Sequence, residues 1–341
     1  MIFLTHTLNF TRIVIGTGNL TLGDWTIWSN AVWIKDFPLK DKSKSETTME
    51  QDSASKKFDF DKDFKITLED FLNSLVPADK NYQTVFGINL NDYEIKGIDV
   101  VLIPSVNGRH KEENFQKYGL QRISTILQGF TQDSAEKWKK KDLVVTYQTT
   151  SVGNLDEKYL QEFLASVLPH YANVQDFKEQ KGKKNEKKKS KSVEMISEPA
   201  PQDERGPASK RVRMIYPDKI YALNALAGPD WAYLLKLEKD YYTNPAFPKE
   251  ILHHYEASDN FFYNNGVLAH LKAMIITERN NVIDDDTIIY FGSHNLTQGA
   301  WGRYEKDFTQ LSINNSELGV LLPPMPGKNF QYYLLSTIDV S

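Results

Sequence analysis

One short pattern occurs twice in this chain, and it restricts the possible folds more than any other feature. IVIGTGNLTLGDW covers residues 13–25 and IYFGSHNLTQGAW covers residues 289–301. Aligned without gaps, the copies agree at two glycines, an asparagine, a leucine, a threonine and a tryptophan. Each copy is an apolar strand that leads into a turn rich in Gly, Asn and Ser or Thr, and such turns present amide groups to anions. The duplication predicts two half-sites that face each other across a pseudo-twofold axis.

The rest of the chain alternates between strand and helix patterns. Short apolar runs rich in β-branched residues predict strands at 98–103, 143–147, 212–216 and 271–276. Apolar residues at helical spacing predict helices within 64–75 and 155–168. We therefore expect an α/β or α+β sandwich, in which helices flank a mixed β-sheet.

Composition removes several kinds of chemistry. The 341 residues include no cysteine, so the chain has no disulfide, no thiolate metal ligand and no thiol nucleophile. Histidine, carboxylate and hydroxyl groups remain for a site. No apolar run approaches the ~20 residues of a membrane helix, and the N-terminal sequence lacks the features of a signal peptide. We expect a soluble protein that makes no contact with membranes.

Two polar segments divide the chain. We expect a first half at residues 1–150, interrupted by a polar insert at 41–57, and a second half formed by residues 151–177 and 211–341. Between the two parts of the second half lies a Lys-rich insert, 178–210, whose composition is typical of disorder. A solvated loop is the simpler interpretation of this insert, and the alternative is a nuclear-import signal or a contact to a phosphate backbone.

A histidine and a lysine lie just upstream of the second copy. His270 and Lys272 are two residues apart on the predicted strand, so their side chains should project to the same face. The chain then turns back through 278–286 and returns as a strand that delivers Asn295 beside them. An imidazole, a fixed positive charge and an amide together can transfer a phosphoryl group without a metal. Alone, the His-x-Lys pair is a weak signal, and an ordinary packed or surface histidine is the simpler interpretation; the adjacent repeat is what favours the functional one.

These residues carry a family resemblance. Gly-Ser-x-Asn-Leu after a strand, preceded by His-x-Lys, resembles the phospholipase D superfamily, whose two His-Lys half-motifs form one active site. That superfamily usually has an aspartate five residues after the lysine, where this chain has Thr277. Asn295 followed by AWG, and then QLSINNSELGVLLPP, is similar to the tyrosyl-DNA phosphodiesterase family. The resemblance is strongest over residues 270–324 and clear over residues 12–33.

The resemblance implies a reaction and a set of roles. In that family a first-motif histidine attacks phosphorus, displaces tyrosine from a DNA 3′ end and forms a phosphohistidine. The second-motif histidine protonates the leaving phenolate and then activates water. By resemblance His270 is this general acid/base, and no metal or other cofactor takes part. Phosphoryl oxygens would be bound by Lys272 and Asn295, and by Asn19 from the first half. Glu317 matches a carboxylate that orients a catalytic histidine, and Ser151 matches a serine near the DNA strand.

The resemblance also implies partners. We expect binding to single-stranded or double-stranded DNA with a 3′ adduct, and to a topoisomerase-derived peptide attached to it. A nuclear location and a monomeric state complete this expectation.

The nucleophile is the point at which the sequence departs from the family. His6 is the sole histidine upstream of Asn19, and position 8 holds Leu8 where the motif requires lysine. We therefore expect the nucleophilic histidine to be missing from this chain and the family domain to continue beyond both ends. The alternative is a catalytically dead relative that binds DNA ends or scaffolds a repair partner. A phosphatidyl-transferring enzyme is a more remote option, against which Thr277 argues.

Overall fold

A computed structural model describes residues 2–5, 9–41, 58–171, 206–225, 228–254 and 270–325 of the chain, with the backbone alone for 2–5 and 231–233. Most of the two polar inserts, and His6, lie outside the described residues. Among the helices of the described part, none combines the length and the apolar character needed to cross a membrane.

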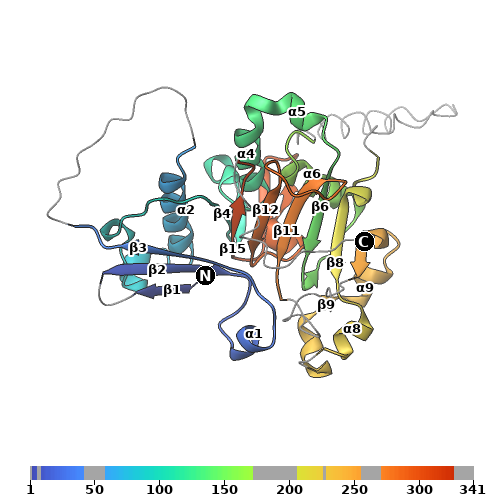
Figure 1. Cartoon of the computed structure of the whole chain (residues 1–341), viewed down its shortest axis with the longest axis horizontal. Coiled ribbons are helices and arrows are strands. Elements are labelled where there is room, and N and C mark those ends of the chain that lie inside the picture. Colours follow the sequence, from blue (N-terminus) through green and yellow to red (C-terminus); the bar gives the residue numbers. More distant parts are fainter. Residues whose placement is uncertain are drawn as a thin grey trace.

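A seven-stranded mixed sheet occupies the centre of the molecule (Figure 1). Across the sheet, its strands are β10 (Leu252–His254), β8 (Val212–Tyr216), β6 (Leu143–Gln148), β11 (Ala273–Glu278), β12 (Ile288–Gly292), β15 (Glu317–Leu322) and β4 (Val101–Ser105). The strands β10, β8 and β6 run parallel, and every other neighbouring pair is antiparallel. The expected mixed sheet is confirmed.

One edge of this sheet collects the segments that carry the predicted site residues. β6 ends at Gln148, which pairs with Ala273 at the start of β11. β12 ends at Gly292, which pairs with Gly319 near the start of β15. In antiparallel neighbours the end of one strand lies beside the start of the next. The segments that follow β6 and β12 and that precede β11 and β15 therefore lie together.

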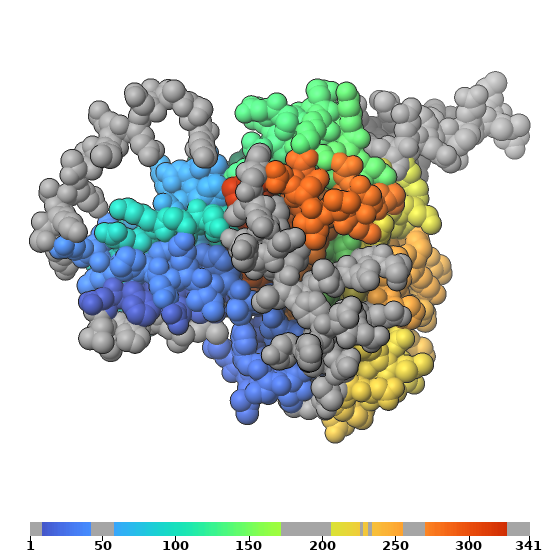
Figure 2. Space-filling model, in the orientation of Figure 1, coloured from blue at the N-terminus to red at the C-terminus, as the bar shows by residue number. Residues whose placement is uncertain are grey.

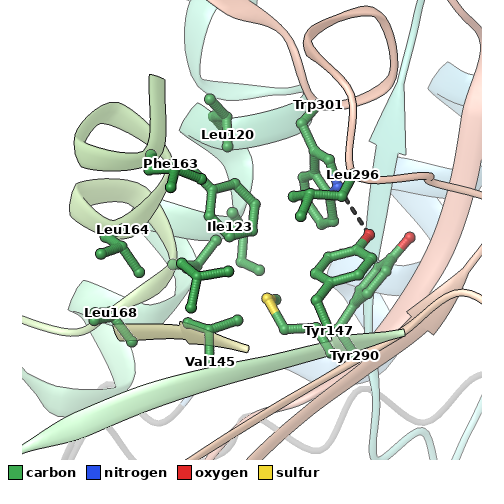
Figure 3. Packing of buried hydrophobic residues seen from close by; sticks show 14 of the residues in the cluster. Leu120, Ile123, Val145, Tyr147, Phe163, Leu164, Leu168, Tyr290, Leu296 and Trp301 are labelled. Atoms are coloured by element: carbon green, nitrogen blue, oxygen red, sulfur yellow. Dashed lines mark hydrogen bonds between the residues drawn. The ribbon is translucent and has the colours of Figure 1, made fainter. Parts of the chain in front are cut away.

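Two helices cover one face of the sheet. They are α4 (Gly119–Thr131) and α6 (Glu157–Val167), and α6 begins after Asp156, which accepts a hydrogen bond from the Tyr159 amide. Their apolar stripes pack against the alternate, inward-facing residues of the strands. Figure 3 shows this core, in which the Trp301 indole donates to the Tyr147 hydroxyl at 2.9 Å. The predicted helix at 155–168 is confirmed within a residue or two of its ends.

The first repeat belongs to a separate small sheet. Its strands are β1 (Ile2–Thr5), β2 (Phe10–Gly16) and β3 (Val32–Pro38), in antiparallel order. This sheet and α2 (Phe60–Ser74) bury their apolar residues against the other face of the large sheet, in a second core that contains Ile15, Leu68 and Val320. The predicted helix at 64–75 corresponds to α2. Figure 1 shows the small sheet and α2 at the left of the large sheet.

Shorter elements complete the described part. Small sheets pair β13 (Arg303–Glu305) with β14 (Gln310–Ile313) and β14 with β5 (Gly108–His110), and β7 (Ser151–Val152) with β9 (Lys236–Leu237). The short helices are α1 (Leu22–Thr26), α3 (Tyr82–Phe86), α5 (Ala135–Lys139), α8 (Lys219–Leu223), α9 (Lys239–Thr243) and α10 (Gln298–Trp301). The 3-10 turns are η1 (Leu90–Asp92), η2 (Glu112–Gln116), η3 (Gln132–Ser134), η4 (Ala208–Arg211), η5 (Pro229–Leu234) and η6 (Lys249–Ile251). η4 lies at the end of the Lys-rich insert, where Ala208 and Ser209 are buried.

The strand that was predicted for His270 and Lys272 is wrong at its beginning. β11 starts at Ala273, so both residues precede the strand. For His270 the reason is its backbone pairing, because its amide donates to the Ser29 carbonyl of the first-repeat loop at 2.9 Å. Lys272 keeps one backbone hydrogen bond to Gly292 of β12 but lies outside the ladder.

Candidate active site

The loop that follows β2 is held in one conformation by its own polar groups. The Thr17 hydroxyl donates to Asn30 Oδ1 at 2.9 Å, and Asn30 Nδ2 donates to the Asp24 carbonyl at 2.6 Å. Thr21 caps α1 by accepting from the Asp24 amide. A small apolar cluster of Trp28, Ala222 and Ala225 attaches the loop to α8, and Figure 2 shows these segments (blue and yellow) on the lower part of the molecule. The loop is thereby fixed beside the large sheet.

His270 is enclosed by this loop. Its ring lies edge-on to Trp28 with a centroid separation of 5.9 Å. Its Nδ1 is 2.7 Å from Asp24 Oδ1, and both side chains are almost completely buried. Burial and the neighbouring charge of Lys272 lower the pKa of His270 from 6.5 to about 4, while the Asp24 carboxylate acts in the opposite direction. His270 is therefore neutral at pH 7 in the unliganded protein.

Lys272 lies between the two halves. Its Nζ donates to the Thr17 carbonyl at 3.2 Å and to the His270 carbonyl at 2.8 Å, and its side chain is 3% exposed. Burial lowers the pKa of Lys272 from 10.5 to about 7, although the negative charges of Asp24 and Glu317 raise it. At neutral pH the Lys272 amine is therefore only partly protonated. An anion bound beside it would raise its pKa and favour the charged form.

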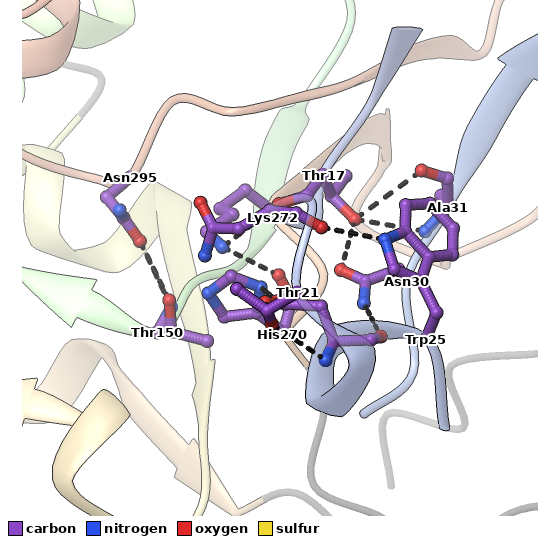
Figure 4. Close-up of polar contacts among 11 residues, drawn as sticks. Thr17, Thr21, Trp25, Asn30, Ala31, Thr150, His270, Lys272 and Asn295 are labelled. Carbon is purple, nitrogen blue, oxygen red and sulfur yellow. Dashed lines mark hydrogen bonds and ion pairs between the residues drawn. The ribbon is translucent and has the colours of Figure 1, made fainter. Parts of the chain in front are cut away.

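Asn295 is oriented by the loop that follows β6. Its Oδ1 accepts hydrogen bonds from the hydroxyls of Thr149 and Thr150, at 3.0 and 3.1 Å, and from the Ser151 amide at 3.0 Å. Figure 4 shows the contact to Thr150. With the carbonyl oxygen occupied in this way, Nδ2 is the part of the carboxamide that remains to donate to an anion. Ser151, predicted to lie near DNA, therefore contacts Asn295 through its backbone.

The second repeat is anchored to the core behind Asn295. The Tyr147 hydroxyl donates to the His294 carbonyl at 2.8 Å, and Trp301 donates to the same hydroxyl. His294 itself is buried and contacts Ser105 Oγ at 2.9 Å and the Tyr290 hydroxyl. His294 is thus a packed residue, and the turn that bears Asn295 is rigid.

Glu317 begins β15 at the same edge. Its Oε1 accepts from Asn315 Nδ2 at 3.1 Å, and burial raises its pKa even though Ser293, Asn315 and Lys272 favour the charged form. Its negative charge acts on Lys272. No hydrogen bond or ion pair joins Glu317 to a histidine in the described ranges, so its role in orienting a catalytic histidine stays a prediction.

Asn19 is exposed at the tip of the first-repeat loop. Its carbonyl accepts from the Trp25 indole at 2.7 Å. Burial raises the pKa of Asp24, but hydrogen bonds from Thr21 and Asn19, together with His270, more than offset this and leave it below the ordinary value. Asp24 therefore links the first-repeat asparagine to His270, and sequence reasoning missed it. The signal was present in the repeat, where Asp24 aligns with Ala300.

His270, Lys272 and the second-repeat turn thus lie at one edge of the large sheet, where the Gly292 amide donates to the Lys272 carbonyl at 3.1 Å. An imidazole, a buried ammonium and an oriented amide can hold a phosphate group and move a proton at it. The fold and this edge define the class of protein: a two-repeat α/β protein with the architecture of the phospholipase D superfamily.

Comparison with known proteins gives the family. The sequence profile described as tyrosyl-DNA phosphodiesterase matches residues 1–332, so the chain belongs to the tyrosyl-DNA phosphodiesterase family. It is 29% identical over 327 residues to tyrosyl-DNA phosphodiesterase 1 of Arabidopsis thaliana, a match that covers 93% of this chain and 45% of the relative. Against tyrosyl-DNA phosphodiesterase 1 of Drosophila melanogaster the identity is 24%, with coverages of 95% and 49%. The chain therefore spans about half the length of these curated relatives.

A solved structure confirms the fold. The crystal structure of the yeast tyrosyl-DNA phosphodiesterase superposes with a TM-score of 0.55 at 14% identity, and the match covers 92% of this chain and 65% of the yeast chain.

The hairpins that end in the two repeats can be compared by their strand register. In the second repeat Lys272 lies opposite Gly292, which donates to its carbonyl. In the first repeat Ile2 pairs with Val14, so by this register Ile2–Thr5 correspond to residues 274–277, which follow the His-Lys pair.

Proposed function

We propose that this chain forms the phosphate-binding core of a phosphodiesterase that hydrolyses 3′-phosphotyrosyl DNA adducts. The observation that carries the proposal is the convergence of His270, Lys272 and Asn295 at one sheet edge, in a member of this family. The two relatives, both named tyrosyl-DNA phosphodiesterase 1, support the substrate class.

The chemistry assigns a step to each group. A nucleophilic imidazole attacks phosphorus to form a P–N bond, and the P–O bond to tyrosine breaks. His270 gives its proton to the departing phenolate, and later takes a proton from the water that attacks phosphorus and breaks the P–N bond. Throughout the reaction Lys272 neutralises charge on the phosphoryl oxygens, and Asn295 and Asn19 donate hydrogen bonds to them.

His270 must carry a proton in the first step, although it is neutral in the free protein. The bound phosphate favours this protonation, because a negative charge beside His270 and Lys272 raises the pKa of both groups. Substrate binding and proton uptake are therefore coupled in this proposal.

The nucleophile separates two functional candidates. His270-Leu271-Lys272 is the sole His-x-Lys in the sequence. Without a nucleophilic imidazole the chain would bind a DNA 3′ end and hydrolyse it slowly, since losing a nucleophile costs several orders of magnitude in turnover. The second candidate is therefore a catalytically dead relative that binds DNA ends or scaffolds a repair partner.

Binding is tested with the chain as it stands. A fluorescent oligonucleotide with a 3′-phosphotyrosine, and the same strand with a 3′-hydroxyl, are titrated by anisotropy. Lys272→Ala should weaken binding of the phosphotyrosyl strand by at least ~10-fold. Lys96→Ala removes a lysine that is 75% exposed and should change nothing. Equal affinity of the protein for both strands would reject the proposal.

Turnover is tested by adding a second His-Lys pair to the chain. A chain extended by His-Leu-Lys directly before Met1 should release tyrosine from the phosphotyrosyl strand and form a covalent DNA adduct that alkali preserves and acid breaks. The chain extended by Gln-Leu-Lys is the matched control. Adduct formation with the first extension alone supports the phosphodiesterase, and binding without any adduct supports the dead relative.

The remaining parts of the proposal concern partners and location. DNA with a 3′ adduct, single-stranded or double-stranded, and the attached topoisomerase-derived peptide are the proposed ligands. A monomer in the nucleus is the proposed state, and the Lys-rich segment at 181–191 supports a nuclear location by its composition alone. The proposed division into two halves, 1–150 and 151–341 with the Lys-rich insert, follows the two repeats.

A further inference from the structure

Two buried polar atoms at the site face each other and have no other partner. His270 Nδ1 and Asp24 Oδ1 are both closed to solvent, and neither forms a well-aligned hydrogen bond with any described group. They are nevertheless 2.7 Å apart. Leaving both buried atoms without a hydrogen bond is costly, so a small rotation of the imidazole that completes this bond is favoured.

The carboxylate is held firmly in place. Its second oxygen, Oδ2, accepts from the Thr21 hydroxyl at 2.6 Å, and the Asp24 carbonyl accepts from Asn30. Asn19 adds a further hydrogen bond to the carboxylate. These hydrogen bonds fix the Asp24 side chain with Oδ1 toward His270 Nδ1 before any ligand binds.

The fold of the loop does not require a carboxylate at this position. Asp24 aligns with Ala300 of the second repeat, where Thr297 caps α10 by accepting from the Ala300 amide at 3.0 Å, as Thr21 caps α1. Alanine thus suffices for the same turn. The two aligned residues have different neighbours: Asp24 contacts His270, whereas Ala300 is buried in the apolar core.

We propose that Asp24 is the positioning residue of His270: it accepts the Nδ1 proton and so leaves Nε2 as the atom that exchanges a proton with the substrate. This inference rests on the proposed function of His270 as acid/base and deepens it. The same carboxylate favours the imidazolium that forms at each proton transfer. Because the second repeat has alanine at the equivalent position, the acid/base role is confined to one half-site.

The proposal is tested by observing the tautomer directly. In the chain labelled with 15N-histidine, NMR distinguishes a ring protonated at Nδ1 from one protonated at Nε2, and the signals of His270 are identified by their loss in His270→Gln. We expect the Nδ1–H form at pH 7 in the wild-type chain. A wild-type His270 that carries its proton on Nε2 would overturn the proposal, whatever the variants do.

Two variants then separate positioning from packing. In Asp24→Asn the amide oxygen should take the Thr21 donor, which turns the NH₂ group toward Nδ1 and forces the Nε2–H tautomer. Asp24→Ala should show the same tautomer for lack of an acceptor. Asp63→Asn breaks a part-buried ion pair with Arg122 in α2 and α4, and it should leave the His270 signals unchanged. Retention of the Nδ1–H form in both Asp24 variants would also overturn the proposal.

The titration of His270 provides the second readout. Its ring is surrounded by the charges of Asp24 and Lys272, with Glu317 acting on Lys272. Removing the Asp24 charge should shift the titration midpoint to lower pH, and Asp63→Asn should not shift it. Neither measurement involves DNA or turnover. The inference about Asp24 can therefore fail while the proposed function stands, and the proposed function can fail while the inference stands.

Discussion

Replacing Lys272 by methionine should stabilise the fold while it abolishes DNA-end binding. Methionine has nearly the shape of the lysine stem and carries no charge. In the folded protein Lys272 is almost fully buried, and no carboxylate in the described part of the chain forms an ion pair with its Nζ. Its two hydrogen-bond partners are backbone carbonyls.

The magnitude follows from the pKa. Burial lowers the pKa of Lys272 from 10.5 to about 7. At pH 7 the unfolded chain therefore binds a proton more strongly than the folded chain, which corresponds to ~4 kcal/mol of lost unfolding free energy. Methionine recovers this amount but leaves the Thr17 and His270 carbonyls without a donor, at about 1 kcal/mol each. The net expectation is a gain of ~2 kcal/mol, or about 3 °C in Tm for a chain of this length.

A second buried lysine provides the control with the opposite sign. Lys141 is 9% exposed, but it pairs with Glu278 and lies 3.0 Å from Asp286, and these partners raise its pKa despite the desolvation. Lys141→Met should therefore destabilise the fold. Thermal unfolding of both variants, at pH 7 and pH 9, is the assay. The advantage of Lys272→Met over the wild type should shrink at pH 9, because the folded pKa of Lys272 is lowered and the wild type gains stability as pH rises above 7. A destabilised Lys272→Met, or a difference independent of pH, would refute the reasoning.

Three further outcomes are expected. Asn295→Asp keeps the oxygen that Thr149, Thr150 and Ser151 bind but replaces the donating amide by a negative charge, so anisotropy should show ~100-fold weaker binding of the phosphotyrosyl strand with an unchanged Tm. Gly119→Ala should lose about 2–5 kcal/mol in urea unfolding, since Gly119 has φ +50° and an added Cβ would lie 2.2 Å from the Trp301 carbonyl oxygen. Complete burial lowers the pKa of His294 from 6.5 to about 3, so stability should fall as pH drops from 6.5 towards 3, with a shallower slope in His294→Gln; equal slopes would contradict this.

The repeat was the feature from which most of the site could be predicted. An asparagine after a glycine at the end of an apolar strand identified Asn19 and Asn295, and the hairpin between 278 and 286 placed Asn295 near Lys272. These inferences depend on local periodicity and on turn residues, which the sequence displays directly. The same applies to α2 and α6, whose apolar stripes run along the whole helix.

The contact between Asp24 and His270 could not be predicted in the same way. The two residues are far apart in sequence, and their meeting depends on how the first-repeat loop lies against the large sheet. That position is set by Trp28 packing against Ala222 and Ala225, a cluster with no periodic pattern. The incorrect start of β11 has the same origin, because Ser29 pairs with His270 where strand propensity would continue the hairpin.

The two repeats have the same local fold but opposite surroundings, and this asymmetry explains the site. Trp301 is fully buried and bonded to Tyr147, so the second repeat is a rigid base that holds Asn295. Trp25 is 43% exposed and donates to the Asn19 carbonyl within its own loop, so the turn of the first repeat lies at the surface, beside His270 and Lys272. Burial lowers the pKa of both groups, and the negative charge that the loop supplies at Asp24 raises it, which keeps the imidazole able to take up a proton. A carboxylate at position 24, and not at position 300, supplies this charge on the side where the histidine lies.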